Sequence, residues 1–289
     1  MSPTSASVIE ADPGAVALRP EAFRAIAAIM DRDARIHIAD GKVTLVQSRL
    51  GRRLRQHGLA SFDDYVRLVE ADADERAAMV VALTTNHTHF FRENHHFEHL
   101  CAEVLPDLKL AAQTRPVRIW SAGCSSGEEV YTIAMCLLGP NAGSAAWLRN
   151  GNVKLLATDL APHVVDATRR GVYAAAGAEP VPAAYRAAWM HAEGDEVTMD
   201  EAARSLVSAK VLNLFAPWPM RRQFDVIFCR NVMIYFDEAA KAELEARLVE
   251  CLLPGGFLYI GHSERLIGAA AATVTSCGQT IYRKLRQPS

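Results

Sequence analysis

The sequence predicts an α/β protein with a parallel sheet, preceded by a small all-helical domain. Two observations support this fold class. After about residue 115, short apolar runs alternate with helical segments, which is typical of parallel strands joined by crossover helices. Before that point the apolar residues recur at helical spacing and no strand pattern is seen. The length of 289 residues is enough for two domains.

The N-terminal part is expected to be helical after a flexible tail. The tail is residues 1–19, which are rich in Ser, Pro, Ala and Gly. The helical domain follows at 20–95 and a linker helix at 96–115. One helix is predicted by Phe23, Ile26 and Met30, which recur at helical spacing, and a second over residues 42–57, ended by Gly58. A third is predicted to begin after the N-cap Ser61, and a fourth to run from about Asp74 to Leu83.

The second domain is expected over residues 116–284. Its strands are predicted at 117–120, 153–157, 224–228, 257–260 and 278–284, and its helices at 128–138, 162–170 and 237–253. Residues from about 180 to 212 fit this alternation poorly and are expected to form an insertion.

Composition argues against several classes of protein. The net charge of −2 gives no bulk attraction to nucleic acid or to an anionic membrane. The six cysteines include no CxxC pair, which disfavours a metal knuckle or a redox pair. Several of them lie in apolar runs, as reduced core cysteines do, and this predicts the cytoplasm. The N-terminus lacks the apolar core of a signal peptide, and no apolar run is long enough to span a membrane.

The most informative motif is the loop after the first predicted strand, residues 118–129. Gly123 and its small neighbours let the backbone approach a ligand, in the kind of crevice where open α/β sheets bind nucleotides. Glu128 and Glu129 would repel a phosphate, so the loop favours a ligand with hydroxyls and a cationic end. Asp159 ends the second strand and is placed to bind ribose hydroxyls; its alternative role is to cap the next helix. We favour the ribose role because the loop lies beside it.

Two further segments are candidate site residues. Arg230 and Asn231 follow a strand at its carboxyl end, and this position favours a ligand site over a structural salt bridge. Residues 83–93 are polar, end in two aromatics and lie at the domain junction, where sites are common. Five histidines fall between residues 87 and 99 and raise zinc as an alternative, but no HExxH accompanies them. We therefore expect surface or capping histidines and no metal.

A basic stripe lies on the helix predicted at 42–57. This arginine stripe consists of Arg49, Arg52, Arg53 and Arg55, with no acid among them. The ordinary explanation is a solvated face. Because neighbouring guanidiniums repel one another, an acidic partner is the second explanation.

Four motifs occur in order along the chain: TTNHTHFFRE at 84–93, WSAGCSSGEE at 120–129, FCRNVMIYF at 228–236 and GHSE at 261–264. In order and spacing they resemble the CheR family of chemotaxis receptor methyltransferases, over about residues 20–284. The resemblance implies a Rossmann-like, S-adenosylmethionine-dependent methyltransferase sheet with a small β-subdomain in the insertion. That segment is short and lacks a clear glycine-rich hairpin, and Val130 stands where the family often has proline.

The resemblance also implies an activity. A methyl group would pass from S-adenosylmethionine to glutamates on the cytoplasmic helices of methyl-accepting chemotaxis receptors, giving methyl esters and S-adenosylhomocysteine. The enzyme would be a cytoplasmic monomer that meets the membrane only through the receptor, without nucleic acid or metal. The family's pattern also implies roles for single residues. Asn86, Thr88 and Arg92 would line the methionyl end of the cofactor, and Gly123 and Glu129 would lie in the cofactor pocket. Asp159 would hold the ribose, and Asn213 and Leu214 would flank the adenine. Arg230 and Asn231 would close the site near Tyr235, and the arginine stripe would match the receptor-docking helix.

This chemistry needs no general base, because a glutamate carboxylate with a reference pKa of about 4.3 is already ionised at neutral pH. Arg92 and Tyr235 are therefore expected to position groups and not to exchange protons. Two other functions remain open. One is an RNA or small-molecule methyltransferase whose arginines grip phosphate, and the other is a regulatory module that binds the cofactor without transfer.

Overall fold

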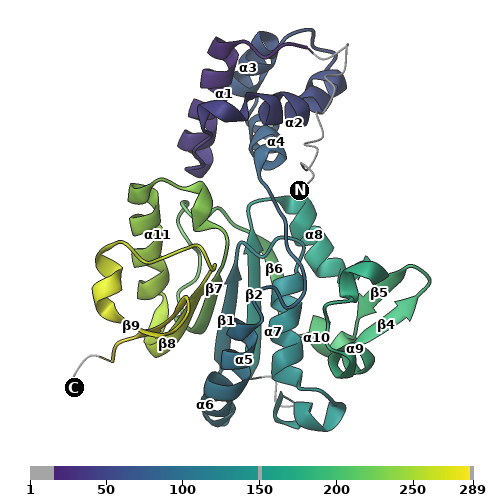
Figure 1. Cartoon of the computed structure of the whole chain (residues 1–289), viewed down its shortest axis with the longest axis vertical. Coiled ribbons are helices and arrows are strands. Elements are labelled where there is room, and N and C mark those ends of the chain that lie inside the picture. Colours follow the sequence, from purple (N-terminus) through teal and green to yellow (C-terminus); the bar gives the residue numbers. More distant parts are fainter. Residues whose placement is uncertain (1–15, 149–151, 287–289) are drawn as a thin grey trace, which may run out of the picture. The chain divides into compact units, whose positions relative to one another are not determined.

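The computed structural model describes residues 16–148 and 152–286. The chain divides into two compact units, Met1–Thr84 and Thr85–Ser289. Figure 1 shows that the first is built of helices and the second around a sheet. Both fold classes predicted from the sequence are thereby confirmed.

Four α-helices lie in residues 16–84, the described part of the first unit. They are α1 (Pro20–Ala34), α2 (Val43–Gln56), α3 (Phe62–Ala71) and α4 (Ala73–Leu83), with a 3₁₀ turn at Asp40–Lys42. Leu50 and Leu54 of α2 are buried on the face expected from their spacing. Ser61 caps α3 by accepting a hydrogen bond from the Asp64 amide, and Asp72 caps α4 in the same way. The helices thus begin where short polar side chains satisfy their first amides.

The second unit contains a seven-stranded sheet with the order β6-β2-β1-β7-β8-β10-β9. The strands are β1 (Val117–Ala122), β2 (Val153–Asp159), β6 (Val207–Val211), β7 (Phe224–Cys229), β8 (Leu252–Ile260), β9 (Val274–Gly278) and β10 (Ile281–Lys284). The first five strands in the order are parallel, and β10 runs antiparallel to β8 and β9. The sheet is therefore mostly parallel, with an antiparallel hairpin at one edge.

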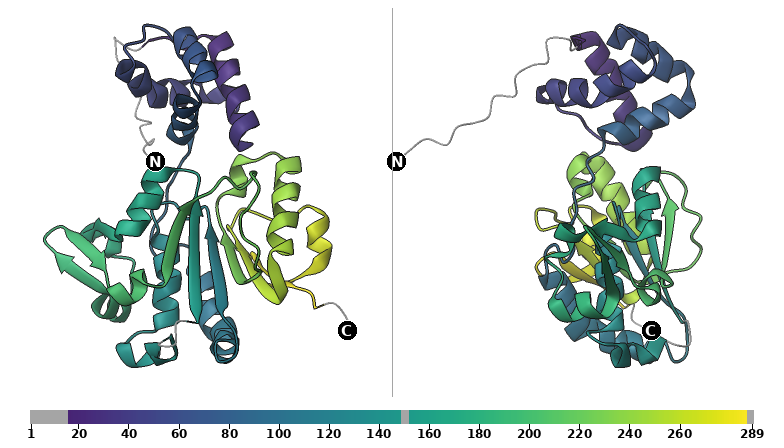
Figure 2. Two further views of the ribbon diagram at one scale, coloured as in Figure 1. Left: turned by 180° about the vertical axis from the view of Figure 1, so that it is seen from behind. Right: turned by 90° about the vertical axis from the view of Figure 1, so that its right-hand side faces the viewer.

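Helices flank the sheet. α5 (His95–His99) and α6 (Leu105–Ala111) precede β1, whereas α7 (Glu128–Leu138), α8 (Pro162–Arg170) and α11 (Glu238–Glu250) lie in the connections from β1 to β2, from β2 to β6 and from β7 to β8. In Figure 1, α5, α6 and α7 lie in front of β1 and β2, and in the reversed view of Figure 2 the strands lie in front. Because the strand order reverses after β6, the right-handed crossover rule puts α11 on the opposite face. Short 3₁₀ turns lie at Ala142–Leu148, Ala175–Ala178, Met233–Tyr235 and Ala269–Thr273.

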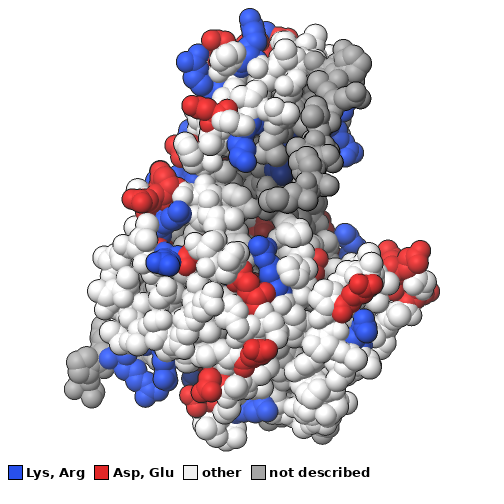
Figure 3. All heavy atoms as spheres, viewed as in Figure 1, with Lys and Arg blue, Asp and Glu red and all other residues white. Residues whose placement is uncertain are grey.

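The surface carries both signs of charge. On the face in view in Figure 3, acidic and basic side chains are interspersed. This pattern agrees with the net charge of −2. Within residues 16–148 and 152–286, no helix has both the length and the apolar character that crossing a bilayer requires.

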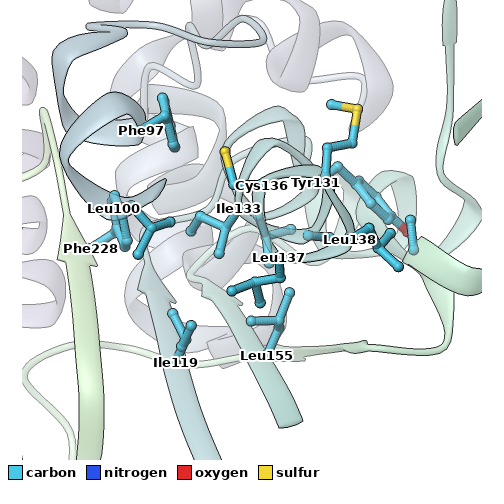
Figure 4. Close-up of a cluster of buried hydrophobic side chains, with 14 of the residues drawn as sticks. Phe97, Leu100, Ile119, Tyr131, Ile133, Cys136, Leu137, Leu138, Leu155 and Phe228 are labelled. Atoms are coloured by element: carbon cyan, nitrogen blue, oxygen red, sulfur yellow. The ribbon is translucent and has the colours of Figure 1, made fainter. Parts of the chain in front are cut away.

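The core of the second unit lies between α7 and the sheet. Ile133 and Leu137 of α7 point toward Ile119 of β1 and Leu155 of β2 (Figure 4). Every residue of α7 from Val130 onward is buried. This packing fixes the N-terminus of α7, which carries the two glutamates of the predicted site.

The boundary between the units falls after Thr84, whereas the sequence placed the end of the helical domain at residue 95. Residues 85–94 are hydrogen-bonded to the loop after β1 and to α7 of the second unit. The Ser125 hydroxyl donates to the Asn86 carbonyl over 2.7 Å. The Phe91 amide donates to the Thr132 hydroxyl over 3.2 Å.

The segment expected as a linker helix at 96–115 is also part of the second unit. It comprises α5, a π-helical turn at Leu100–Val104 and α6. Phe97 and Leu100 are buried in the core cluster. Apolar side chains at this spacing need a partner surface, and the sheet unit supplies it.

The insertion contains a second sheet, with the order β3-β5-β4. Its strands are β3 (Val172–Ala174), β4 (Met190–Glu193) and β5 (Glu196–Met199), and α9 (Ala183–Trp189) and α10 (Glu201–Arg204) flank the hairpin. β4 and β5 are antiparallel, and Gly194 between them has φ 59°. A small antiparallel sheet is thus present, although the sequence showed no clear hairpin.

The bounds of 180–212 expected for the insertion are wrong at both ends. The small sheet begins earlier, at Val172, and β6 belongs to the main sheet. β6 was missed because it is an edge strand with mostly exposed, alternating side chains and not a continuous apolar run.

Candidate functional site

The predicted site residues of the second domain gather at the carboxyl ends of parallel strands. Gly123 follows β1, Asp159 ends β2, Asn213 and Leu214 follow β6, and Arg230 and Asn231 follow β7. Because β6, β2, β1 and β7 are successive neighbours, these ends form one edge of the sheet. Gly261 and Glu264 follow β8 at the same edge.

The loop between β1 and α7 is held tightly. Gly123 has φ 79°, and its amide donates to the Thr158 carbonyl of β2 over 2.8 Å. A Cβ at this position would lie 2.4 Å from Cγ2 of Val232. Glycine is therefore required here both by the left-handed backbone and by the approach of the β7 loop.

Asp159 secures the same loop from β2. Its carboxylate accepts hydrogen bonds from the amides of Ser125 over 2.9 Å and Ala161 over 3.0 Å. The N-cap of α8 is Ala161, and no side chain caps that helix, so the capping alternative for Asp159 is wrong. Burial raises the pKa of Asp159 although the backbone amides oppose this. A carboxylate oxygen can accept more than one hydrogen bond, so the Asp159 carboxylate retains acceptor capacity for a ligand hydroxyl.

The two glutamates of the α7 N-terminus have different partners. Glu129 accepts hydrogen bonds from the Ser121 hydroxyl over 2.7 Å and from Nη1 of Arg230 over 3.0 Å. Glu128 accepts one from the Ser126 hydroxyl over 2.7 Å. Burial raises the pKa of both carboxyls, and the Arg230 charge opposes this at Glu129. Only Glu129 is thus tied into the rest of the site.

The guanidinium of Arg230 is the centre of an ion cluster. Its side chain is only 2% exposed and lies 3.0 Å from Oε2 of Glu129 and 3.3 Å from Oε2 of Glu93. It also donates to the Arg92 carbonyl and lies over the ring of Phe97. Arg230 therefore joins the end of β7 to α7 and to the segment 85–94.

Glu93 is the second residue at the centre of this ion cluster. It lies in the first sequence motif, but no role was predicted for it. Its Oε1 accepts from Nδ2 of Asn231 over 3.2 Å and lies 2.8 Å from Nδ1 of His262. Burial raises the pKa of Glu93, but Arg230, His262 and Asn231 outweigh it and lower the pKa to about 2. Glu93 and Asn231 both have left-handed backbones, with φ of 57° and 58°. Such a conformation is uncommon for a glutamate and commoner for an asparagine, and at Glu93 it is held by the surrounding bonds.

Glu264 was also left without a role. Its side chain is buried and accepts hydrogen bonds from the amides of Gly261 (2.5 Å), Asn231 (3.1 Å) and Ile234 (3.2 Å). These bonds fix the turn that carries Tyr235. The signal in the sequence was an acid just beyond a buried strand, which must find donors if it is buried.

The segment 85–94 is held by hydrogen bonds within itself and to the residues after β7. Arg92 donates from Nη1 to the His87 carbonyl over 2.8 Å. The Tyr235 hydroxyl donates to the Thr85 carbonyl over 3.4 Å, and Thr88 is half-buried. The segment is thus bonded to Tyr235, which follows β7, and at Asn86 to Ser125, which follows β1.

Asn213 and Leu214 continue the edge beyond β2. The Leu212 amide donates to the Asp159 carbonyl over 2.9 Å. The Asn213 side chain accepts from the Phe215 amide over 2.9 Å, and the Leu214 side chain is buried. These bonds hold the chain after β6 against the residue proposed for the ribose.

Three of the five histidines between residues 87 and 99 have hydrogen-bond partners in the second unit, and His95 contacts the Gln279 carbonyl over 3.3 Å. Nε2 of His96 lies 2.9 Å from the Thr280 hydroxyl, and Nδ1 of His99 lies 2.8 Å from the Tyr259 hydroxyl. Burial lowers the pKa of both, to about 3 for His96. Among the described residues, no three His, Cys, Asp or Glu side chains are grouped so that they could hold a metal ion.

The arginine stripe divides into two pairs in the first unit. Arg49 donates to the carbonyls of Leu83 and Thr84, both over 2.8 Å. Arg53 forms an ion pair with Glu75 of α4. The expectation that the stripe lacks acidic neighbours is therefore wrong for Arg53, because the acid comes from another helix. Arg52 and Arg55 are exposed, and neither has an ion pair or side-chain hydrogen bond among the described residues.

Two family models match the chain. One is described as "CheR methyltransferase, all-alpha domain" and matches residues 21–84. The other is described as "CheR methyltransferase, SAM binding domain" and matches residues 86–282. Their junction coincides with the structural boundary after Thr84.

Curated relatives agree with these models. The chain is 43% identical over 260 residues to the "Probable chemotaxis protein methyltransferase" of Rhizobium etli, covering 87% of this chain and 95% of the relative. It is 38% identical over 269 residues to "Chemotaxis protein methyltransferase 2" of Pseudomonas aeruginosa, covering 91% and 92%. It is 36% identical over 274 residues to the "Chemotaxis protein methyltransferase" of Escherichia coli, covering 92% of each chain. The protein belongs to the CheR family of S-adenosylmethionine-dependent methyltransferases.

Proposed function

We propose that the protein methylates glutamate side chains on the cytoplasmic helices of methyl-accepting chemotaxis receptors, with S-adenosylmethionine as the methyl donor. The products are glutamyl methyl esters and S-adenosylhomocysteine. Family membership supports the methyl transfer, and the names of the relatives support a chemotaxis substrate. The observation that carries the proposal is the carboxylate-rich edge of the sheet at Glu129 and Asp159.

This edge fits the cofactor by its chemistry. Asp159 offers acceptors to ribose hydroxyls, and the acids at the start of α7 suit a cationic ligand better than a phosphate. When bound, the cofactor supplies a methyl group activated by its attachment to a positively charged sulfur. We assign Asn86, Thr88 and Arg92 to the methionyl end, Gly123 and Glu129 to the pocket wall, Asp159 to the ribose, Asn213 and Leu214 to the adenine, and Arg230 and Asn231 to the closure of the site.

The residues of the chain act by positioning. The accepting glutamate is ionised at neutral pH, since its reference pKa is about 4.3, so no base is required. Arg92 and Tyr235 are placed by bonds to the carbonyls of His87 and Thr85, and we assign them to orienting the reacting groups. Alignment of reacting groups lowers barriers by up to about 7–11 kcal/mol. Opposite charges cancel as the methyl group moves, so exclusion of water also favours transfer.

The receptor would dock through the exposed half of the arginine stripe. Arg52 and Arg55 are free to meet carboxylates on a receptor helix, while Arg49 and Arg53 are engaged within the first unit. Guanidinium groups bind carboxylates in a two-pronged geometry. We therefore assign substrate docking chiefly to Arg52 and Arg55. We further propose that the enzyme acts in the cytoplasm and that it works as a monomer.

The deciding experiment is incubation with methyl-labelled S-adenosylmethionine and receptor cytoplasmic fragments, followed by alkali. Methyl esters hydrolyse and release labelled methanol, whereas N-methyl groups do not. The matched control is the same fragment with its candidate glutamates replaced by glutamine. Label that is stable to alkali would indicate another methyltransferase class, and cofactor binding without any label would indicate a regulatory module.

A further inference from the structure

Glu93 is unusual because a single buried carboxylate contacts side chains from several elements. Oε2 lies 3.3 Å from Nη2 of Arg230 and 3.7 Å from Nδ1 of His96 on α5. Oε1 accepts from Asn231 over 3.2 Å and lies 2.8 Å from His262 beyond β8. The side chain is 11% exposed. A carboxylate in this setting is stable only while its donors remain in place.

Two of the groups that Glu93 contacts, Arg230 and Asn231, are ones assigned above to the closure of the proposed site. Arg230 has a carboxylate on either side: its Nη1 donates to Glu129, and its Nη2 donates to the Arg92 carbonyl while also lying 3.3 Å from Oε2 of Glu93 in an ion pair. Asn231 has a left-handed backbone, and its carboxamide is turned toward Glu93. Without the charge of Glu93, Arg230 would lose one of its two neighbouring carboxylates, and Asn231 would lose the charged acceptor of its side chain.

We infer that Glu93 is a positioning residue of the methyltransferase site, which fixes the Arg230 guanidinium and the Asn231 carboxamide in one arrangement for cofactor binding. The inference rests on the proposed function for the roles of Arg230 and Asn231. Glu93 acts through these two side chains and does not itself contact the reacting atoms.

The test is a double-mutant cycle of Glu93→Gln, Arg230→Gln and the double variant. Calorimetry measures affinity for S-adenosylhomocysteine, and kinetics measures kcat and KM for S-adenosylmethionine. Glu93→Gln keeps the size of the side chain and one acceptor oxygen but removes the charge that holds Arg230. We expect a loss of about 10-fold to 100-fold in affinity and in kcat/KM, as displacements of about 1 Å at active sites produce.

The cycle separates positioning from a general loss of structure. Arg230→Gln leaves Glu93 and Glu129 facing each other without a cation, so the double variant should bind the product no more weakly than Arg230→Gln alone. Losses that multiply in the double variant, or a Glu93→Gln affinity within about twofold of the native protein, would overturn the inference.

The controls make every outcome decisive. Glu98→Gln removes the same charge from an exposed position on α5 and should leave product affinity unchanged. Circular dichroism checks folding, and if Glu93→Gln does not fold, the charged but shorter Glu93→Asp takes its place in the cycle with the same expectation. If the native protein binds the product but labels no receptor, the proposed function fails while the cycle still decides the role of Glu93.

Discussion

Replacing Glu75 by glutamine should destabilise the first unit. The Glu75 carboxylate is 4% exposed and lies among donors from α2 and α3. It accepts from Nε of Arg53 over 2.9 Å and from the Tyr65 hydroxyl over 2.7 Å, and it lies 2.8 Å from Nε2 of His57. Glutamine keeps the shape but removes the charge that these donors share.

The size of the effect follows from these contacts. Hydrogen bonds to charged groups contribute about 1.5–3 kcal/mol, and breaking a fully buried ion pair costs about 3–5 kcal/mol. Since the Arg53 side chain is 26% exposed, water replaces part of the lost interaction, and we expect about 2 kcal/mol. For a domain of this size, that corresponds to a fall in Tm of about 8–16 °C.

The same network gives a dependence on pH. Burial raises the pKa of Glu75, but hydrogen bonds from Arg53, Tyr65 and His57 outweigh it and lower the pKa. A lowered pKa contributes stability that is present above the unfolded value of about 4.3 and is lost as the pH falls through the folded value. Below about pH 4, the stability of the native protein should therefore approach that of Glu75→Gln.

Thermal unfolding of the full chain, followed by circular dichroism with hydrogen exchange across α2 and α4, measures this effect. Glu70→Gln is the matched control, because it removes the same charge from an exposed position on α3. An equal change in both variants, or a gap between Glu75→Gln and the native protein that stays constant from pH 7 to pH 3, would refute the reasoning.

Three further predictions concern the second unit and the stripe. Gly123→Ala should lower the free energy of unfolding in urea by more than about 2 kcal/mol, because a left-handed alanine costs about 1–2 kcal/mol and its Cβ would overlap Val232. The control Gly177→Ala, with open space around its Cβ, should change the free energy of unfolding little. Asp159→Asn should weaken calorimetric binding of S-adenosylhomocysteine about tenfold, and this loss should vanish for an analogue without ribose hydroxyls. Arg52→Glu with Arg55→Glu should lower kcat/KM for the receptor about tenfold or more at low salt, with cofactor affinity unchanged; a loss that persists at high salt would count against charge-based docking.

The strands and helices near the site could be predicted from the sequence because their signals are local. The helices at 128–138 and 162–170 are found with the predicted bounds, since each begins and ends at residues that mark helix termini. The carboxyl-end rule also located Asp159 and Arg230 at one edge of the sheet. β6 had no such signal, because an edge strand buries little and its pattern resembles that of a loop.

The partners of the charged residues could not be predicted in the same way. Nothing near Arg53 in sequence shows that Glu75, on α4, pairs with it. Asn231 and Glu93 are 138 positions apart and meet only because the segment 85–94 lies at the carboxyl edge of the sheet. Such pairings depend on tertiary packing, to which helical periodicity and strand alternation are insensitive.

Acids in three of the four motifs are bonded to donors in another motif. A buried carboxylate must be bonded to donors, so an acid inside a mostly buried motif predicts a donor in another motif. Glu93 of the first motif is bonded to Asn231 of the third, and Glu129 of the second is bonded to Arg230 of the third. Glu264 of the fourth motif holds the Asn231 amide from the other side. The four motifs are therefore one hydrogen-bonded unit that converges on Arg230 and Asn231. A substitution in any of them should be interpreted first by what it does to the positions of those two side chains.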